Sequence, residues 1–260
     1  MTVALPILSA CGLETCILPS AVLSSHSGGF TGYTVRDLSE DMPRIGSHWQ
    51  KEGITFDAIY TGYLGKTKEI GYMMELIPAL KAPGGRVAVD PAMADHGKLY
   101  AGLDEAYAVR MRELCTQADV ILPNLTEACM LTDTPYPLRG GEAEVGALME
   151  KLWALGPENV VITGAADSAG SIGIAVGTAG EVRMIRHDKV PKSYHGTGDM
   201  FAAALVGAWM QGKSVYGAAK IAADFTRESI ERTYREPAHW YGVRFEEGLG
   251  GLICAVSAQE

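Results

Sequence analysis

The chain is poor in cysteine, with five in 260 residues, and none of them forms a C-x-x-C pair. Scattered cysteines, odd in number and without such a pair, fit reduced thiols better than a disulfide framework. Reduced thiols are typical of proteins that stay inside the cell. We therefore expect a cytoplasmic protein.

Basic residues are also scarce, since 22 Lys and Arg stand against 31 Asp and Glu, giving a formal net charge of -9. Nucleic acids and anionic membranes both favour clustered Lys and Arg, so neither is an expected partner. No apolar run approaches the roughly 20 residues that a membrane span needs. The apolar start lacks a basic region and reaches Glu14 early, which argues against a signal peptide. These features predict a soluble protein.

Linkers, internal repeats and low-complexity segments are missing as well. A chain of this length can bury a sizeable core without dividing into two units. We therefore expect one domain over residues 1–260.

Several catalytic signatures are absent too. No G-x-G-x-x-G follows an early strand, which argues against a dinucleotide-binding dehydrogenase. No G-x-S-x-G nucleophile elbow is present, and the six histidines show no metal-ligand spacing.

What the chain does contain is an alternation of short apolar runs with longer amphipathic segments. The expected strands are Thr15–Pro19, Phe56–Thr61, Arg86–Asp90, Asp119–Leu122 and Asn159–Thr163, followed by a hairpin of Ser171–Val176 and Glu181–Ile185. The expected helices are Arg36–Glu52, Lys66–Lys81, Asp104–Cys115, a segment from Asn124, Gly141–Leu155, Gly198–Gln211 and Ser214–Thr233, with a loop over Ser24–Tyr33. This order predicts an α/β fold with a mostly parallel sheet, helices on both faces and a late antiparallel hairpin.

Polar loops follow four of these strands directly. Ligands of such sheets bind beyond the carboxyl ends of the strands. The loops concerned are Thr61–Gly65, Asp90–Asp95, Asn124–Glu127 and Thr163–Gly164. We expect them to line one rim of the sheet.

Two glycine motifs compete as phosphate sites. Gly207–Ser214 satisfies the P-loop pattern, but the residues before it read as a helix, whereas a P-loop follows a strand. Gly212 is better interpreted as ending one helix and Ser214 as capping the next. The stronger candidate is Gly196-Thr197-Gly198-Asp199, a glycine turn that opens a helix whose N–H groups and positive dipole end suit an anion. Asp199 is then either a helix-start carboxylate or a base that takes a proton from a substrate hydroxyl.

These segments together resemble the ribokinase-like superfamily, and within it the pyridoxal/pyridoxamine kinases of vitamin B6 salvage. The resemblance lies in five segments that occur in the order of that family: Ser24–Gly28, Thr61–Gly65, Asp90–Tyr100, Ala118–Ala128 and His195–Asp199. It implies a ribokinase-like fold and ATP-dependent phosphorylation of the 5'-hydroxymethyl group of pyridoxal, pyridoxamine or pyridoxine.

The resemblance also implies roles for individual residues. Asp199 would be the catalytic base, and Gly196, Thr197 and Gly198 would form the anion hole. The remaining implied contacts are Asp90, Asn124, Glu127, Thr163 and His187 for the nucleotide, Ser27, Gly28, Tyr63 and Asp199 for the pyridine substrate, and Asp95 and Glu127 for the metal.

The implied cofactors are ATP and Mg²⁺, with a monovalent cation such as K⁺ as an optional one. Mg²⁺ keeps several bound waters and takes few protein carboxylates, which suits Asp90 and Asp95 if they contact the ion largely through water. The resemblance to this family also implies a homodimer.

Plainer interpretations stay open for three of these residues. Asp90 before Pro91 can be turn chemistry, and Asn124 with Glu127 can be a capping box. The chain opens on a segment that resembles the helix after the first strand of the family, so we expect that strand to be absent from this sequence. Two other functions remain: hydroxymethylpyrimidine kinase of thiamine synthesis, and a catalytically silent binding protein.

Overall fold

Runs of Val, Ile and Ala build the central sheet of the protein. In the computed structural model, residues 3–25, 30–137, 141–167, 170–236 and 238–258 are described. The sheet has six strands in the order β10-β9-β8-β7-β4-β3. Their bounds are β3 Phe56–Thr61, β4 Lys81–Val89, β7 Val120–Ile121, β8 Asn159–Asp167, β9 Ser171–Thr178 and β10 Glu181–Asp188.

The four strands from β3 to β8 are parallel, and the last two are antiparallel. Val89 pairs with Ile121 and Val120 with Asn159, which aligns the carboxyl ends of the inner strands at one edge. β9 and β10 form the expected hairpin, which turns at Ala179 and Gly180, both with positive φ. The mostly parallel sheet with a late hairpin is therefore confirmed.

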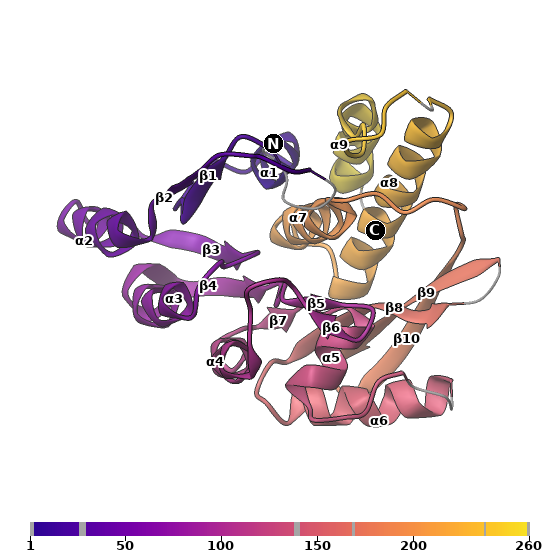
Figure 1. The fold of residues 1–260 in the computed structure, drawn as a ribbon, viewed down its shortest axis with the longest axis horizontal. Helices are drawn as coiled ribbons and strands as arrows, with labels where there is room; N and C mark the ends of the chain where they lie inside the picture. Colours follow the sequence, from indigo (N-terminus) through magenta and orange to yellow (C-terminus); the bar gives the residue numbers. More distant parts are fainter. Residues whose placement is uncertain (1–2, 26–29, 138–140, 168–169, 237, 259–260) are drawn as a thin grey trace.

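Helices cover both faces of this sheet (Figure 1). Figure 1 shows α7, α8, α1 and α9 on one side, and α3, α4, α5 and α6 on the other. The helices are α1 Ala4–Ala10, α2 Met42–Lys51, α3 Thr67–Leu80, α4 Glu105–Cys115, α5 Leu125–Leu131, α6 Glu142–Trp153, α7 Thr197–Met210, α8 Val215–Tyr234 and α9 Leu249–Ser257.

Side chains that alternate along the strands contribute to two separate hydrophobic cores, one on each face of the sheet. Ala88 and Val120 belong to the cluster under α7 and α8, whereas Val87, Val89 and Ile121 belong to the cluster under α3 to α6. Successive side chains of a strand point to opposite faces, so a buried parallel strand must be apolar at every position. This is why the inner strands read as unbroken apolar runs.

Helix α7 is the most deeply buried helix beside the site. Every residue from Met200 to Trp209 is buried, because the helix lies between the sheet, α8 and α1. An added Cβ at Gly207 would lie 2.5 Å from the Sγ of Cys11, so a glycine is what lets α1 approach. This packing fixes the direction in which α7 presents its first turn.

The expected strand Thr15–Pro19 is wrong, since the segment contains no strand. Its composition is apolar enough, yet a strand exists only where a neighbour pairs with it, and β3 pairs with β4 alone among the described residues. Ile17 is accordingly 51% exposed, although Leu18 still packs on the core beneath α3.

The expected helix over residues 36–52 begins too early. Val35–Asp37 forms strand β2, which pairs with β1 (Ala21–Leu23), and a short 3-10 turn over Ser39–Asp41 precedes α2. The carboxylate of Asp37 accepts hydrogen bonds from the N–H and hydroxyl of Ser39, a local turn that competes with helix formation.

Among the described residues, no helix combines the length and the apolar character that crossing a membrane would require.

Candidate active site

The polar loops after the inner strands meet at one rim of the sheet, as expected. The N–H of Asp90 donates to the carbonyl of Thr61 at 2.9 Å, which joins the end of β4 to the end of β3. Asn124, beyond the end of β7, forms a parallel bridge with Thr163 of β8, and the N–H of Thr163 donates to the carbonyl of Pro123 at 3.0 Å. Asp90 and Asn124 thus follow β4 and β7, whereas Thr163 lies within β8. The expected loop over Thr163–Gly164 is wrong, because β8 continues to Asp167 by pairing with β9, with a register shift between Ile162 and Ala166.

Asn124 and Glu127 form the capping box that the sequence left open. The side chain of Asn124 accepts from the N–H of Glu127 at 3.0 Å, and the carboxylate of Glu127 accepts from the N–H of Asn124 at 2.8 Å. The same carboxylate accepts from the N–H groups of Met93 and Ala94 at 3.0 and 3.3 Å. Glu127 therefore ties helix α5 to the loop that carries Asp90 and Asp95.

Asp90 and Glu127 are two buried carboxyl groups that influence each other. Asp90 is 8% exposed, and its pKa is raised well above the ordinary value by burial and then by the charges of Glu127 and Asp199. Burial raises the pKa of Glu127 to about 7, against three backbone hydrogen bonds that lower it. Like charges held this close favour proton retention or a bound cation.

The first turn of α7 faces this pair. Gly196 is the N-cap residue with φ 84°, a left-handed conformation that glycine adopts without strain, and as a glycine it has no side chain to cap the helix. An added Cβ at Gly198 would meet nothing within 4 Å, so the backbone here lies open to a ligand. The hydroxyl of Thr197 donates to the carbonyl of Tyr194 at 3.2 Å, which fastens the turn.

Asp199, the third residue of α7, lies next to the rim. Its charge contributes to the raised pKa values of Asp90, Tyr60 and Tyr100. The side chain is half-buried. The structure thus brings together Asp90, Glu127, Asp199 and the glycine turn, which come from distant parts of the sequence.

The P-loop-like segment has no part in this cluster. Gly207 lies inside α7, and Gly212 (φ 92°) ends that helix. Ser214 caps α8 by accepting from the N–H of Gly217 at 3.1 Å. The ammonium of the buried Lys213 donates to the carbonyl of Ala258. The interpretation of Gly212 as a helix end and of Ser214 as a helix cap is confirmed.

Other predicted residues lie further out. Asp95 is exposed on the short strand β5 (Ala94–Asp95), and its carboxylate accepts from the N–H of His96 at 2.8 Å. Tyr63 is 51% exposed, with its ring 6.4 Å from that of Tyr100. The buried carboxylate of Glu69 holds the loop of Tyr63 by accepting from the N–H of Gly65 at 2.7 Å. Ser27 and Gly28 lie outside the described residues.

His187 occupies a separate place on the edge strand β10. It lines a hollow of about 240 Å³ together with Ser171, Arg186, Asp188 and Arg227. Its Nε2 is buried without a hydrogen-bond partner among the described groups, and its Nδ1 lies 3.8 Å from a carboxylate oxygen of Asp224. Burial lowers the pKa of this imidazole, so it is present mainly as the neutral form at pH 7.

Two tyrosines of the cluster were missed by the sequence reasoning. Tyr60, at the end of β3, and Tyr100, after the short strand β6 (Lys98–Leu99), both have pKa values raised by burial first and by the surrounding carboxylates next. The signal that could have found Tyr60 is its position one residue before the rim loop.

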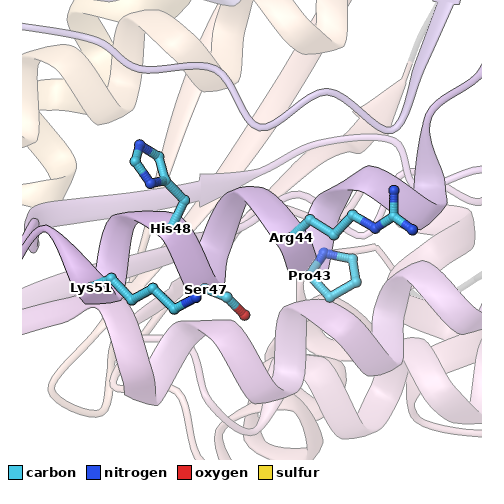
Figure 2. Close-up of a pocket in the computed structure, with 5 residues that line it drawn as sticks. All are labelled: Pro43, Arg44, Ser47, His48 and Lys51. Carbon is cyan, nitrogen blue, oxygen red and sulfur yellow. The ribbon is translucent and has the colours of Figure 1, made fainter.

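A larger hollow of about 350 Å³ lies elsewhere, along the outer side of α2 (Figure 2). Figure 2 shows that the residues lining it, Pro43, Arg44, Ser47, His48 and Lys51, all come from this one helix. None of the expected site residues is among them, so we place the candidate site at the rim.

The described carboxylates do not form a ready-made metal cage. Among the described residues, no three His, Cys, Asp or Glu side chains are grouped so that they could hold a metal ion. A cation at the rim would therefore need ligands beyond the protein, such as phosphate oxygens and water.

Comparison with known proteins gives consistent matches. A family model described as phosphomethylpyrimidine kinase matches residues 21–242. The chain is 29% identical to a pyridoxine/pyridoxal/pyridoxamine kinase of Bordetella pertussis, over 98% of this chain and 87% of the relative.

Two solved structures extend the likeness to the fold. A candidate phosphomethylpyrimidine kinase of Bacteroides thetaiotaomicron, solved with pyridoxal, is 35% identical with a TM-score of 0.91, covering 97% of this chain and 90% of that one. The pyridoxal kinase of Lactobacillus plantarum is 31% identical with a TM-score of 0.88, covering 96% and 90%.

Proposed function

The chain belongs to the phosphomethylpyrimidine kinase family of the ribokinase-like superfamily, and we propose that it transfers the γ-phosphoryl group of ATP to the 5'-hydroxymethyl group of pyridoxal, pyridoxamine or pyridoxine. The choice of a B6 vitamer is supported by the pyridoxal kinases among its relatives and by the similar structure that holds pyridoxal. The observation that carries the chemistry is the meeting of Asp199 and the α7 glycine turn with the buried carboxylate of Asp90.

Asp199 is the general base of the proposed reaction. As the acceptor oxygen attacks the γ-phosphorus, its proton passes to the Asp199 carboxylate, a new P–O bond forms, and the bond to the β-phosphate oxygen breaks to release ADP. A carboxylate suits this task because the alcohol loses its proton only as the P–O bond forms.

The opening of α7 stabilises the migrating phosphoryl group. The backbone N–H groups of Thr197 and Gly198, together with the positive end of the helix dipole, face anions placed above the turn. The left-handed Gly196 and the open space over Gly198 support this role, because a Cβ at either position would strain or narrow the cradle. Donors fixed before the reaction stabilise the transition state without reorganisation.

Mg²⁺ fits the rim, with Asp90, Asp95 and Glu127 as the side chains that would lie near it. The fit rests on the raised pKa values of Asp90 and Glu127, since carboxyl groups that disfavour each other's charge are stabilised by a cation. The scarcity of protein ligands also agrees, because Mg²⁺ keeps waters and phosphate oxygens in its shell. The bound ion would neutralise charge on the phosphates, and K⁺ would be an optional monovalent addition.

The nucleotide would extend along the same edge of the sheet. Asn124 and Thr163 would lie beside its phosphates, since Asn124 follows β7 and bridges to Thr163 of β8. His187 would lie along the nucleotide further out, at the end of β10. The hollow beside it and its unpartnered Nε2 support a ligand contact there. The pyridine ring would then lie on the side of Tyr63, Ser27 and Gly28.

The proposed enzyme is a single-domain homodimer of the cytoplasm. The dimer is supported by apolar side chains exposed near the start of the chain: Val22 is 58% and Val35 is 57% exposed on the β1–β2 ribbon. Light scattering during gel filtration tests it, and a mass near that of one chain would contradict it.

The direct test of function is turnover of pyridoxal and hydroxymethylpyrimidine side by side, with MgATP and the full chain. We expect ADP and pyridoxal 5'-phosphate to form together, and a much lower kcat/KM for the pyrimidine. Turnover of the pyrimidine alone would reassign the substrate to thiamine synthesis. Binding of pyridoxal without ATP consumption would make the chain a binding protein.

A further inference from the structure

The rim loop over residues 62–65 carries an exposed aromatic ring on a backbone with little stiffness of its own. Glycines stand on both sides of Tyr63 and Leu64, and glycine leaves the chain more conformational freedom than any other residue. Tyr63 is 51% exposed, so the packing of its own ring orders the loop only in part. The rest of the order must come from groups that hold the neighbouring backbone.

Two buried side chains from different helices hold that backbone. The hydroxyl of Tyr107, on α4, donates to the carbonyl of Leu64 at 2.5 Å, and Tyr107 is only 1% exposed. The carboxylate of Glu69, on α3, accepts from the N–H of Gly65 at 2.7 Å, and Glu69 is 2% exposed. The carbonyl of Leu64 and the N–H of Gly65 belong to one planar peptide group, which is therefore fixed on both of its hydrogen-bonding sides.

The ring of Tyr63 lies against this peptide group. An added Cβ at Gly65 would lie 3.7 Å from Cε1 of Tyr63 and 3.8 Å from Oε2 of Glu69, so Gly65 is within reach of both the ring and the carboxylate. The side chain of Leu64 is itself buried in the core that Tyr107 joins. Fixing the peptide group therefore fixes the place of the ring.

The carboxylate of Glu69 does more than begin a helix. Glu69 is the third residue of α3, where a glutamate commonly accepts from the N–H of the N-cap residue, here Lys66. Gly65 precedes that N-cap residue, so the hold on it extends beyond the helix into the rim loop. Burial of a carboxylate costs free energy, which a helix start on the surface does not require. A role in the loop gives a reason for this buried group.

We propose that Tyr107 and Glu69 are positioning residues for the pyridine substrate, which act through the ring of Tyr63. By holding the peptide group before Gly65, they keep that ring where it contacts the pyridine. This role rests on the proposed function, which places the pyridine on the side of Tyr63. A ring that is ordered before the substrate arrives loses little conformational entropy on binding, so the affinity for the pyridine is higher.

The test compares Tyr107→Phe with Thr233→Val as a control. Thr233 is buried in α8 on the other face of the sheet (Figure 1), where its hydroxyl donates to the carbonyl of Ser229 at 2.7 Å and accepts from the N–H of Arg244 at 2.9 Å. For Y107F we expect the Kd of pyridoxal, titrated without ATP, to rise about three- to tenfold, as the loss of one hydrogen bond implies. The kcat and the KM for ATP should stay within about twofold, and T233V should leave all three values within about twofold.

Glu69→Gln and Glu69→Ala form a graded pair on the other side of the peptide group. The glutamine keeps an oxygen that can accept from Gly65, so E69Q should raise the Kd of pyridoxal less than about threefold. E69A removes a charged acceptor, and we expect a rise of about tenfold or more. Equal Kd values for E69Q and E69A would contradict the proposal.

A third arm tests whether Tyr107 acts through Tyr63. In the Tyr63→Ala background, Y107F should change the Kd of pyridoxal less than about twofold, because the ring that it positions is gone. The full three- to tenfold loss in that background would overturn the proposal.

The remaining outcomes also decide. A folded Y107F whose Kd for pyridoxal stays within about twofold of the wild type would refute the proposal, as would an equal rise in the KM for ATP. A Y107F chain that unfolds would assign the hydroxyl to stability alone and overturn it too. A wild type that binds pyridoxal without consuming ATP would refute the proposed function, while the Kd values would still decide the positioning role. A wild type that does not bind pyridoxal would refute both.

Discussion

Removing the carboxylate of Glu127 should loosen the rim of the site. Glu127→Ala leaves three backbone N–H groups without their acceptor, those of Asn124, Met93 and Ala94, at a position that is 2% exposed. Each buried donor left unpaired costs about 1–3 kcal/mol, and water that enters the vacated space offsets part of the sum. We expect a loss of about 3 kcal/mol in the free energy of unfolding, or about 6–12 °C in Tm.

Two comparison variants sharpen this prediction. Glu127→Gln keeps an oxygen acceptor for the N–H groups of Met93 and Ala94, so it should cost about half as much as the alanine variant. Glu142→Ala removes an exposed carboxylate that pairs with Arg186, and it should cost less than about 1 kcal/mol. Calorimetry or urea unfolding in metal-free buffer measures all three.

The pH dependence adds an independent check on Glu127. Its pKa is raised from 4.5 to about 7 in the folded protein, so the folded state binds more protons across that window. The wild type should therefore lose stability relative to E127Q as the pH rises from about 4.5 to 7. An E127A chain as stable as E142A, or a wild type that gains on E127Q over that window, would refute the reasoning.

Two further predictions concern the helices around the site. Gly207→Ala should lower the free energy of unfolding by about 1–3 kcal/mol, because the added methyl group forces α1 away from α7 at Cys11. The control Gly146→Ala, whose Cβ would meet nothing within 4 Å, should be neutral or stabilising by up to about 1 kcal/mol. Equal Tm values for the two variants would contradict this prediction. Lys213→Met should leave the Kd for ATP within about twofold by calorimetric titration, because its ammonium holds Ala258, and a tenfold weaker Kd would restore the P-loop interpretation.

The sequence was most informative where one local rule decided the structure. Unbroken apolar runs such as Asn159–Thr163 predicted buried parallel strands, because both faces of those strands are covered. The glycine turn before Asp199 predicted a helix start, and the structure has the N-cap of α7 at Gly196. Gly212 and Ser214 were likewise local signals for a helix end and a helix start.

The misses depend on partners that lie far away in the chain. Thr15–Pro19 has strand composition, but pairing requires a neighbour, and composition does not supply one. Val35–Asp37 became a strand instead of a helix because β1 lies beside it. Tyr60 acquires its surroundings only when β3, β4 and α7 meet, so its place among the carboxylates could not be read from spacing.

The most direct test of the central claim is the kcat of Asp199→Asn with pyridoxal and MgATP, with the exposed Asp57→Asn as control. Loss of a general base costs about a hundredfold or more, so we expect kcat to fall at least that far while the Kd for ATP stays within about threefold. A D199N enzyme that keeps more than a tenth of the wild-type kcat would contradict the account.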